Sequence, residues 1–178
     1  MLSIRPATLS DISAIARIYS GSVINGTATF ELEPPTETEM AERMRHLLDA
    51  GFPYLTAEWN GAVAGYAYAA AYRIRPAYRF TVENSLYVSP TAQRRGVGRA
   101  LLNTLIEESA RRGFRQMIAV IGDSPNQLAS VTLHKAAGFR VVGTLEDVGF
   151  KHGRWLDSLL MQRALGEGAS SAPPEPGR

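Results

Sequence analysis

The sequence predicts one α/β domain built around a mixed β-sheet. The chain has 178 residues and a hydrophobic content of 45%, the size of one compact domain with a sizeable core. Its strand-like and helix-like segments follow in the order β-α-α-β-β-β-α-β-α-β-β, with no internal repeat. We assign the domain to residues 1–165. Residues 166–178 are polar and rich in Pro and Gly, and we expect a disordered tail there.

The first 50 residues predict a strand and two amphipathic helices. Residues 2–5 are strand-like, and the pair Thr8 and Asp11 has the spacing of a capping box before a helix. A Gly- and Thr-rich loop over residues 25–35 follows, and Thr36 begins a second capping pattern. The apolar residues expected to face the core are Ile12, Ile15, Ala16, Tyr19, Met40, Met44, Leu47 and Leu48.

The middle of the chain predicts three strands. Residues 54–59 and 62–72 flank Asn60-Gly61, a dipeptide that favours the tight turn of an antiparallel hairpin. A third strand is expected over residues 80–88, and Ser89-Pro90 ends it.

The last third predicts two helices and three strands. A helix is expected to end at Arg112, before Gly113, and residues 116–121 read as a strand buried on both faces. Ser124-Pro125 has the pattern of a helix start, and Gly138 closes that helix. Strands are expected at 139–145 and 155–162.

Composition argues against several classes of protein. The chain has no cysteine, and its three histidines lack the spacing of a helical metal pair, so we expect no metal site. No apolar run reaches the roughly 18 residues of a membrane span, and the first residues do not resemble a signal peptide. We therefore expect a cytoplasmic protein that binds no membrane. The net charge of only +2 gives little support to nucleic-acid binding.

One short motif indicates an anion-binding site. Gln93-Arg94-Arg95-Gly96-Val97-Gly98 lies between a strand and a long helix. The first N–H groups of a helix have no intrahelical partner, and glycine lets a large anion approach them. The spacing matches neither a dinucleotide fold nor a P-loop, so a diphosphate fits best. A plain strand-to-helix turn with solvated arginines remains the alternative from spacing alone.

The motif resembles the Q/R-x-x-G-x-G/A signature of the Gcn5-related N-acetyltransferases (GNAT). Further segments, VENSLYVSP, IAVIGDSPN, LHKAAGF and GTLEDVGFKHGRW, are similar to the phosphinothricin and methionine sulfoximine acetyltransferase branch. The resemblance covers nearly the whole of residues 4–162. It implies a mostly antiparallel, twisted sheet with helices on both faces. It also implies a splay, at a bulge, in the strand that binds acetyl-CoA.

The resemblance implies that acetyl-CoA is the co-substrate and assigns residues to it. Free backbone groups of the splayed strand would pair with the pantetheine arm, and one N–H would polarise the thioester carbonyl. The helix start would bind the diphosphate, and an asparagine further on would contact the cofactor or simply cap a helix. The cofactor-binding residues are Leu86, Tyr87, Val88, Gln93, Arg94, Arg95, Gly96, Val97, Gly98, Arg99 and Asn126.

Two residues are candidates for proton transfer. An alkyl amine with a pKa of about 10 is mostly protonated at neutral pH, so acetylation requires a group that removes a proton. Glu83 lies in an apolar strand and matches the glutamate of the branch, although an ion pair or a surface position is the alternative. His134 stands where many acetyltransferases have a tyrosine that protonates the departing thiolate. A purely structural histidine is the alternative.

Acceptor recognition is expected from two arginines and three aromatic residues, Phe30, Tyr78 and Phe80. Residues i and i+2 of a strand share a face, so Arg73 and Arg75 would converge on an acidic group of the acceptor. Two solvated arginines at a strand end are the alternative. Glu83 belongs to the same expected site, and the branch resemblance implies that arginines at this place bind the amino-acid substrate. It also suggests that Lys151, His152 and Trp155 close the pocket or a subunit contact.

The sequence therefore predicts a homodimeric N-acetyltransferase that transfers acetyl directly from acetyl-CoA, in a ternary complex, to the α-amine of a small amino acid analogue. Phosphinothricin, methionine sulfoximine and methionine sulfone are the acceptors that the resemblance implies. The alternatives are another amine or a protein N-terminus as acceptor, or a sensor that binds acyl-CoA without turnover. A nucleic-acid-binding role would depend only on Arg94, Arg95, Arg99, Arg111 and Arg112.

Overall fold

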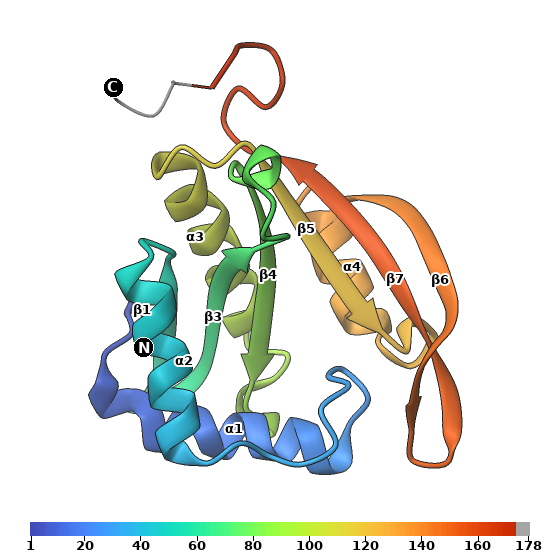
Figure 1. Cartoon of the computed structure of the whole chain (residues 1–178). Helices are drawn as coiled ribbons and strands as arrows, with labels where there is room; N and C mark the ends of the chain where they lie inside the picture. The colour runs from blue at the N-terminus through green and yellow to red at the C-terminus, as the bar shows by residue number, and fades with distance from the viewer. Residues whose placement is uncertain (174–178) are drawn as a thin grey trace.

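A computed structural model describes residues 1–173 and confirms the mixed sheet (Figure 1). Seven strands are ordered β1-β2-β3-β4-β5-β7-β6, and only the β4–β5 pair is parallel. The hairpin predicted at Asn60-Gly61 joins β2 to β3, and both residues have positive φ as the tight turn requires. The strands are β1 (Leu2–Pro6), β2 (Tyr54–Trp59), β3 (Ala62–Ala71), β4 (Thr81–Val88), β5 (Gln116–Gly122), β6 (Arg140–Lys151) and β7 (Arg154–Ala164).

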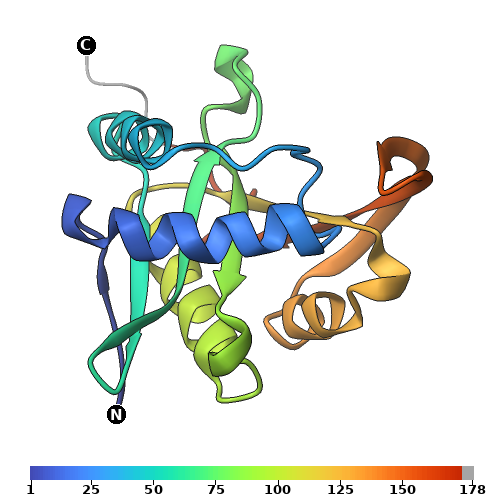
Figure 2. The same cartoon turned by 90° about the horizontal axis from the view of Figure 1, so that it is seen from below.

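Helices cover both faces of the sheet (Figures 1 and 2). Both predicted capping boxes form: Thr8 with Asp11 precedes the first helix, and Thr36 with Glu39 opens the second. Helices α1 and α2 lie on one face, and α3 and α4 lie on the other. Their bounds are Ile12–Asn25 for α1, Glu37–Asp49 for α2, Val97–Arg111 for α3 and Leu128–Ala136 for α4.

The alternation of side chains along the strands builds two cores. Tyr54 and Tyr66 pack under α1 and α2, whereas their neighbours Leu55 and Ala67 pack against α3. The core against α3 is wholly apolar at its centre. Its fully buried residues include Leu101, Leu102, Leu105, Val82 and Met117. The sheet is therefore a rigid base from which the central strands can present polar side chains.

The central strands β4 and β5 separate halfway along their length. They pair from Thr81 with Gln116 to Asn84 with Ala119, and the rest of β4 has no partner on that side. The splay is therefore present, but the expected bulge is not, because β4 pairs with β3 from Val82 to Val88 without a register shift. The strands diverge through the sheet's twist and the end of their pairing.

Three sequence predictions differ from the structure in detail. The strand β5 alternates between buried and accessible residues, because its open edge beside β4 leaves Val120 accessible. The segment at Ser124-Pro125 forms only a 3-10 turn over Ser124–Asn126 before α4 begins. The strand expected to end at residue 145 continues to Lys151 through an irregularity at Asp147, whose φ is +53°.

Past β7 the chain forms turns over residues 166–169, and the described part of the chain ends at residue 173. Within the predicted tail, Glu167 accepts a hydrogen bond from Arg115 at 3.2 Å, and Gly168 donates to the Leu165 carbonyl. Residues 174–178 of that prediction lie outside the described part of the chain. In the described residues, none of the helices combines the length and the apolar character that a bilayer crossing requires.

Candidate active site

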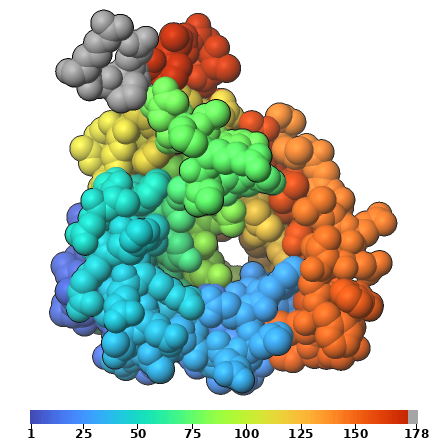
Figure 3. Space-filling view, viewed as in Figure 1, coloured from blue at the N-terminus to red at the C-terminus, as the bar shows by residue number. Residues whose placement is uncertain are grey.

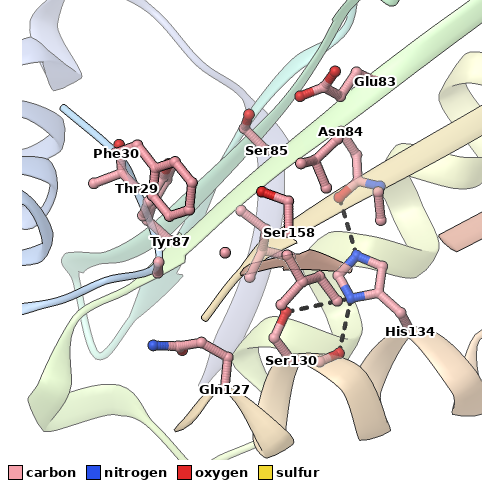
Figure 4. A pocket seen from close by; sticks show the side chains of 16 residues that line it. Thr29, Phe30, Glu83, Asn84, Ser85, Tyr87, Gln127, Ser130, His134 and Ser158 are labelled. Atoms are coloured by element: carbon pink, nitrogen blue, oxygen red, sulfur yellow. Dashed lines mark hydrogen bonds between the residues drawn. The ribbon is translucent and has the colours of Figure 1, made fainter. Parts of the chain in front are cut away.

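A cavity of about 280 Å³ lies where β4 and β5 separate. Figure 3 shows a hollow at this place, between the two strands and the loop that follows α1. The walls come from that loop, from β4 and β5, and from α4 (Figure 4). Its polar or aromatic lining residues include Thr29, Phe30, Glu83, Asn84, Ser85, Tyr87, Gln127, Ser130, His134 and Ser158.

The pleat of β4 divides these residues between the two faces of the sheet. Glu83, Ser85 and Tyr87 point to the face covered by α1 and α2, as the packing of Tyr87 on Tyr19 shows. Asn84 points to the opposite face and contacts His134 of α4. The cavity therefore passes through the sheet, with Glu83 on one side and His134 on the other.

Glu83 is a half-buried carboxyl without a cation beside it. None of the ion pairs within residues 1–173 includes it. Burial raises the pKa of Glu83, because the charged form loses hydration without gaining a partner. The structure thus brings the predicted base into the cavity in a setting that increases its affinity for a proton.

His134 is held at both ring nitrogens. Its side chain is only 4% exposed, and Nε2 lies 3.1 Å from Oδ1 of Asn84. Nδ1 lies 2.8 Å from the carbonyl oxygen of Ser130, one turn earlier in α4. Burial lowers the pKa of His134, and the contact with the Ser130 carbonyl opposes that shift. The ring of Phe139 packs edge-on against the imidazole with centroids 5.0 Å apart.

A second cleft of about 480 Å³ connects the cavity to the glycine motif. Ala28 and Gln127 line both, and the second cleft extends past Val88 to Gln93. Beyond it, Gly96 has a φ of +82° and precedes α3, whose first internal hydrogen bond runs from Ala100 to the Gly96 carbonyl. The N–H groups of residues 97–99 come before that bond and are available to a ligand.

The side chains of the glycine motif and of the residue after it differ in exposure and in contacts. Arg94 and Arg99 are exposed, whereas Val97 is buried in the core and can offer a ligand only its backbone. Arg95 donates to the Thr91 carbonyl at 3.3 Å and lies over the Trp59 ring. At Gly98, an added Cβ would meet Leu133, Val88 and Leu86 at ordinary contact distances.

Asn126 does not line either of these cavities. Its side-chain amide donates to both carboxylate oxygens of Asp123, at 3.0 and 3.2 Å. This contact lies within the 3-10 turn before α4, and Asn126 is the N-cap of neither the turn nor the helix, whose N-cap residues are Asp123 and Gln127.

Asp123, which the sequence analysis missed, anchors the loop that closes the cavity. It is 3% exposed, pairs with Arg154 and accepts a hydrogen bond from Thr27 at 2.6 Å. The hydrogen bond from Arg154 lowers the pKa of Asp123 to about 2, so it remains a carboxylate. Lys151 adds a 2.9 Å bond to the Thr29 carbonyl. The only sequence signal was an aspartate at the carboxyl end of a strand.

Phe30 fixes the same loop by filling a space left by two glycines. A Cβ added at Gly122 would come within 2.6 Å of the Phe30 ring, and one added at Gly149 would overlap it as well. Phe30 is therefore wedged against β5 and β6 and forms one wall of the cavity. Phe30 lies at the cavity, where the sequence placed it. It also anchors the loop, which the sequence did not indicate.

The prediction that Arg73 and Arg75 share a strand face is wrong, because β3 ends at Ala71. Both are exposed in the loop before β4, and Arg73 stacks over Tyr72 and Tyr78. Tyr78 lines a separate groove of about 260 Å³ rather than the cavity. The loop re-enters the sheet at Thr81, close to Glu83, and Figure 3 shows it projecting above the hollow.

Comparison with known proteins gives consistent matches over the whole domain. The model of the acetyltransferase (GNAT) domain family matches residues 4–160. A phosphinothricin N-acetyltransferase of Alcaligenes faecalis is 51% identical over 96% of this chain and 86% of its own. An L-methionine sulfoximine/L-methionine sulfone acetyltransferase of Salmonella typhimurium is 40% identical over 95% of this chain and 98% of its own.

A solved structure also matches this chain over nearly its whole length. The crystal structure of a GNAT superfamily phosphinothricin acetyltransferase from Sinorhizobium meliloti, in complex with AcCoA, superposes with a TM-score of 0.94. It is 50% identical and covers 98% of this chain and 94% of its own. In residues 1–173 no cluster of side chains has the composition of a metal site.

Proposed function

Because this chain belongs to the acetyltransferase (GNAT) family and is an acetyl-CoA-dependent N-acetyltransferase, we propose that it acetylates the α-amine of a small amino acid analogue. Phosphinothricin, methionine sulfoximine and methionine sulfone are the proposed acceptors, as the names of its relatives suggest. The observation that supports this most strongly is the unpaired, half-buried Glu83 in a cavity that opens on both faces of the sheet.

The residues present fit acetyl-CoA at the glycine motif and the free edge of β4. The N–H groups before the first helical bond of α3, together with Arg94 and Arg99, suit a diphosphate. The unpaired part of β4, at Leu86, Tyr87 and Val88, offers backbone groups to an extended arm. Acetyl-CoA supplies the activated acetyl group, and these residues orient it toward the cavity.

The two faces of the cavity suit direct transfer in a ternary complex. Glu83, on the α1/α2 face, removes the proton of the acceptor amine, directly or through water, and its raised pKa makes it a stronger base. The acceptor then attacks from this side while the thioester is held on the other. Acetyl transfer by this route needs no covalent intermediate with the protein.

A panel assay tests the proposed acceptor. Thiol release from acetyl-CoA is measured with phosphinothricin, methionine sulfoximine, methionine sulfone, ordinary amino acids, polyamines and peptides. Preference for one of the first three supports the proposal. Preference for peptides or polyamines would replace it with one of the other acceptors, and no release with any amine would favour a sensor.

Arg75 is proposed to bind the acidic or strongly polar oxygen of the acceptor from the rim above Glu83. It is exposed, and no ion pair in the described residues includes it. A charge-assisted hydrogen bond contributes about 1.5–3 kcal/mol, so Arg75→Ala should lower kcat/KM for an acidic acceptor about ten- to a hundredfold. Arg75→Lys should also lose activity, because an ammonium lacks the planar fork of donors.

The control for this prediction is Arg79→Ala in the same loop. Arg79 lies over the Phe80 ring and donates to the Pro76 carbonyl, so its loss removes an equal charge without removing the proposed contact. Each variant is assayed with an acidic acceptor and an uncharged amine of similar size. Equal losses with both acceptors would show that Arg75 supports the fold rather than the acceptor.

We also propose that the protein is a homodimer through the outer strands of the sheet. Val148, Phe150 and Trp155 are between 52% and 62% exposed at the β6–β7 hairpin, and the two rings contact each other. An exposed patch of large apolar residues on a sheet edge is typical of a subunit contact. A cytoplasmic location remains a prediction from the sequence.

Trp155→Asp should disrupt such a dimer, because it places a charge in the apolar contact. Sedimentation equilibrium should show a dimer for the parent and a monomer for the variant at micromolar concentrations. Leu128→Asp, an equally exposed apolar residue on α4, is the control and should remain dimeric. A monomeric parent would contradict the proposal.

A further inference from the structure

The face of the sheet that carries Glu83 also carries Ser158, a serine with no role in the proposed transfer. Glu83 is paired with Ile118 of β5. Further along β5, Gly122 is paired with Ser158 of β7. Because paired residues share a face, and every second residue of a strand points to the same side, Ser158 points to the side of Glu83. The step from residue 118 to residue 122 spans about 13 Å of β-strand, so Ser158 lies at the far end of the cavity.

Ser158 is nearly buried, yet its hydroxyl reaches the cavity. The residue is only 6% exposed and lines the cavity, and Figure 4 shows its oxygen pointing into the space that Phe30 and Ser85 also border. Within residues 1–173, the hydrogen bonds of β7 side chains come from other residues of the strand. In the same residues, the side-chain oxygens enclosed without a partner belong to Tyr66 and Ser109. The Ser158 oxygen is therefore unpartnered and open to whatever fills the cavity.

The surface around the Ser158 hydroxyl is apolar. The Phe30 ring occupies the space over Gly122, where an added Cβ would come within 2.6 Å of it, and Gly122 is the residue paired with Ser158. Val120, which is 38% exposed, lies on the same face of β5 and lines the cavity. Among the described residues that line the cavity, only Glu83, at the other end, carries a carboxylate. The far end therefore offers one hydroxyl beside apolar surface.

We propose that the Ser158 hydroxyl binds the oxygen-bearing end of the acceptor side chain and makes the site select such acceptors. Phosphinate, sulfone and sulfoximine groups, as they occur in the proposed acceptors, each carry an oxygen and a methyl group. The oxygen accepts a hydrogen bond from Ser158, and the methyl packs on Phe30 and Val120. This inference rests on the proposed function, which places the amine at Glu83 and leaves the α-carboxylate to Arg75 at the rim.

The selectivity follows from the cost of leaving the hydroxyl unpaired. A thioether sulfur is a weak acceptor, so methionine would displace water from the Ser158 hydroxyl without replacing its hydrogen bond. Leaving a buried hydroxyl unpaired costs more than a typical hydrogen bond contributes, and a site built around a polar group rejects the ligand that lacks the matching group. Methionine and methionine sulfone share one carbon skeleton, so the comparison between them isolates this contact.

Ser158→Ala should lower the ratio of kcat/KM for methionine sulfone to kcat/KM for methionine about tenfold. The loss with the sulfone should lie chiefly in KM, because the hydroxyl is remote from the reacting atoms. Methionine should be acetylated equally well or better, because the variant has no hydroxyl to leave unpaired. Steady-state kinetics with the two acceptors, each at saturating acetyl-CoA, measures the ratio.

Ser109→Ala is the matched control. Ser109 is a fully buried serine of α3 whose hydroxyl also has no partner among the described residues, but it does not line the cavity. Its variant should keep the ratio of the parent. An unchanged ratio in Ser158→Ala would overturn the proposal. Equal losses with both acceptors would also overturn it, because Ser158 would then support the fold rather than the choice of acceptor.

Binding in the absence of turnover separates this inference from the proposed function. Titration calorimetry with the protein saturated in CoA, which carries no acetyl group, measures the affinity for each acceptor. The parent should bind methionine sulfone more tightly than methionine, and Ser158→Ala should reduce that difference about tenfold. Equal affinities of the parent for the two would overturn the Ser158 contact alone. If the parent released thiol from acetyl-CoA with no amine, the proposed function itself would fail.

Discussion

Glu83→Gln should lower the acetylation rate about 10²- to 10⁴-fold, the usual effect of losing a general base. Glutamine keeps the size and the hydrogen bonding of the side chain but cannot accept a proton from the acceptor amine. The rate of the parent should rise with pH as Glu83 loses its proton, at a pH above the ordinary value because burial raises its pKa. Single-turnover kinetics across pH checks both statements, and the variant should lack this rise.

The same substitution should not harm the fold. A carboxyl whose pKa is raised on folding contributes stability below its unfolded pKa and loses it as pH rises through the folded pKa. At neutral pH the Glu83 carboxylate therefore opposes folding, and Glu83→Gln should unfold at an equal or higher temperature. Glu107→Gln, an exposed carboxyl on α3, is the control for charge and should affect neither rate nor stability. Full activity of Glu83→Gln at neutral pH would mean that the amine loses its proton by another route.

Gly96→Val should weaken acetyl-CoA binding about ten- to a hundredfold, as the loss of a charge-assisted hydrogen bond would. Gly96 has a φ of +82° and no atom within 4 Å of an added Cβ, so the new side chain would project into the open space before α3. A diphosphate that approaches the helix start would meet it there. Titration calorimetry measures the change directly.

Gly113→Val is a matched control for the backbone strain. Gly113 ends the same helix, has a φ of +88° and also has nothing within 4 Å of an added Cβ. Both variants should lose stability by a similar amount, about 1–2 kcal/mol for a side chain in the left-handed region. Only Gly96→Val should lose affinity. Equal affinities in the two variants would show that the diphosphate binds elsewhere.

The sequence predicted features that depend on neighbouring residues. The capping boxes at Thr8 and Thr36 and the turn at Asn60-Gly61 are decided within a few residues, and all three are present. The placement of Glu83 in the cavity could also be anticipated, because an unpaired carboxyl in an apolar strand needs a reason to be there.

Features that depend on distant contacts could not be predicted. Arg73 was assigned to a strand because nothing local shows that pairing between β3 and β4 stops at Ala71. The bond from Thr27 to Asp123 joins residues 96 positions apart. The two acceptors around His134 come from β4 and from its own helix, and only the packing of α4 on the sheet brings them together.

The wedge of Phe30 between two glycines constrains the order in which this wall of the cavity can evolve. A Cβ added at Gly122 or Gly149 would come within 2.6 Å of the ring, so neither glycine can gain a side chain unless the Phe30 ring shifts. The ring can shrink first, since its loss leaves a void but creates no overlap. Descendants of this protein can therefore enlarge the site in one step, at position 30, and refill it later from Gly149, whereas an added Cβ at Gly122 would still meet the Thr27 carbonyl oxygen at 2.9 Å. The reverse sequence of changes passes through a form in which the Phe30 ring must move.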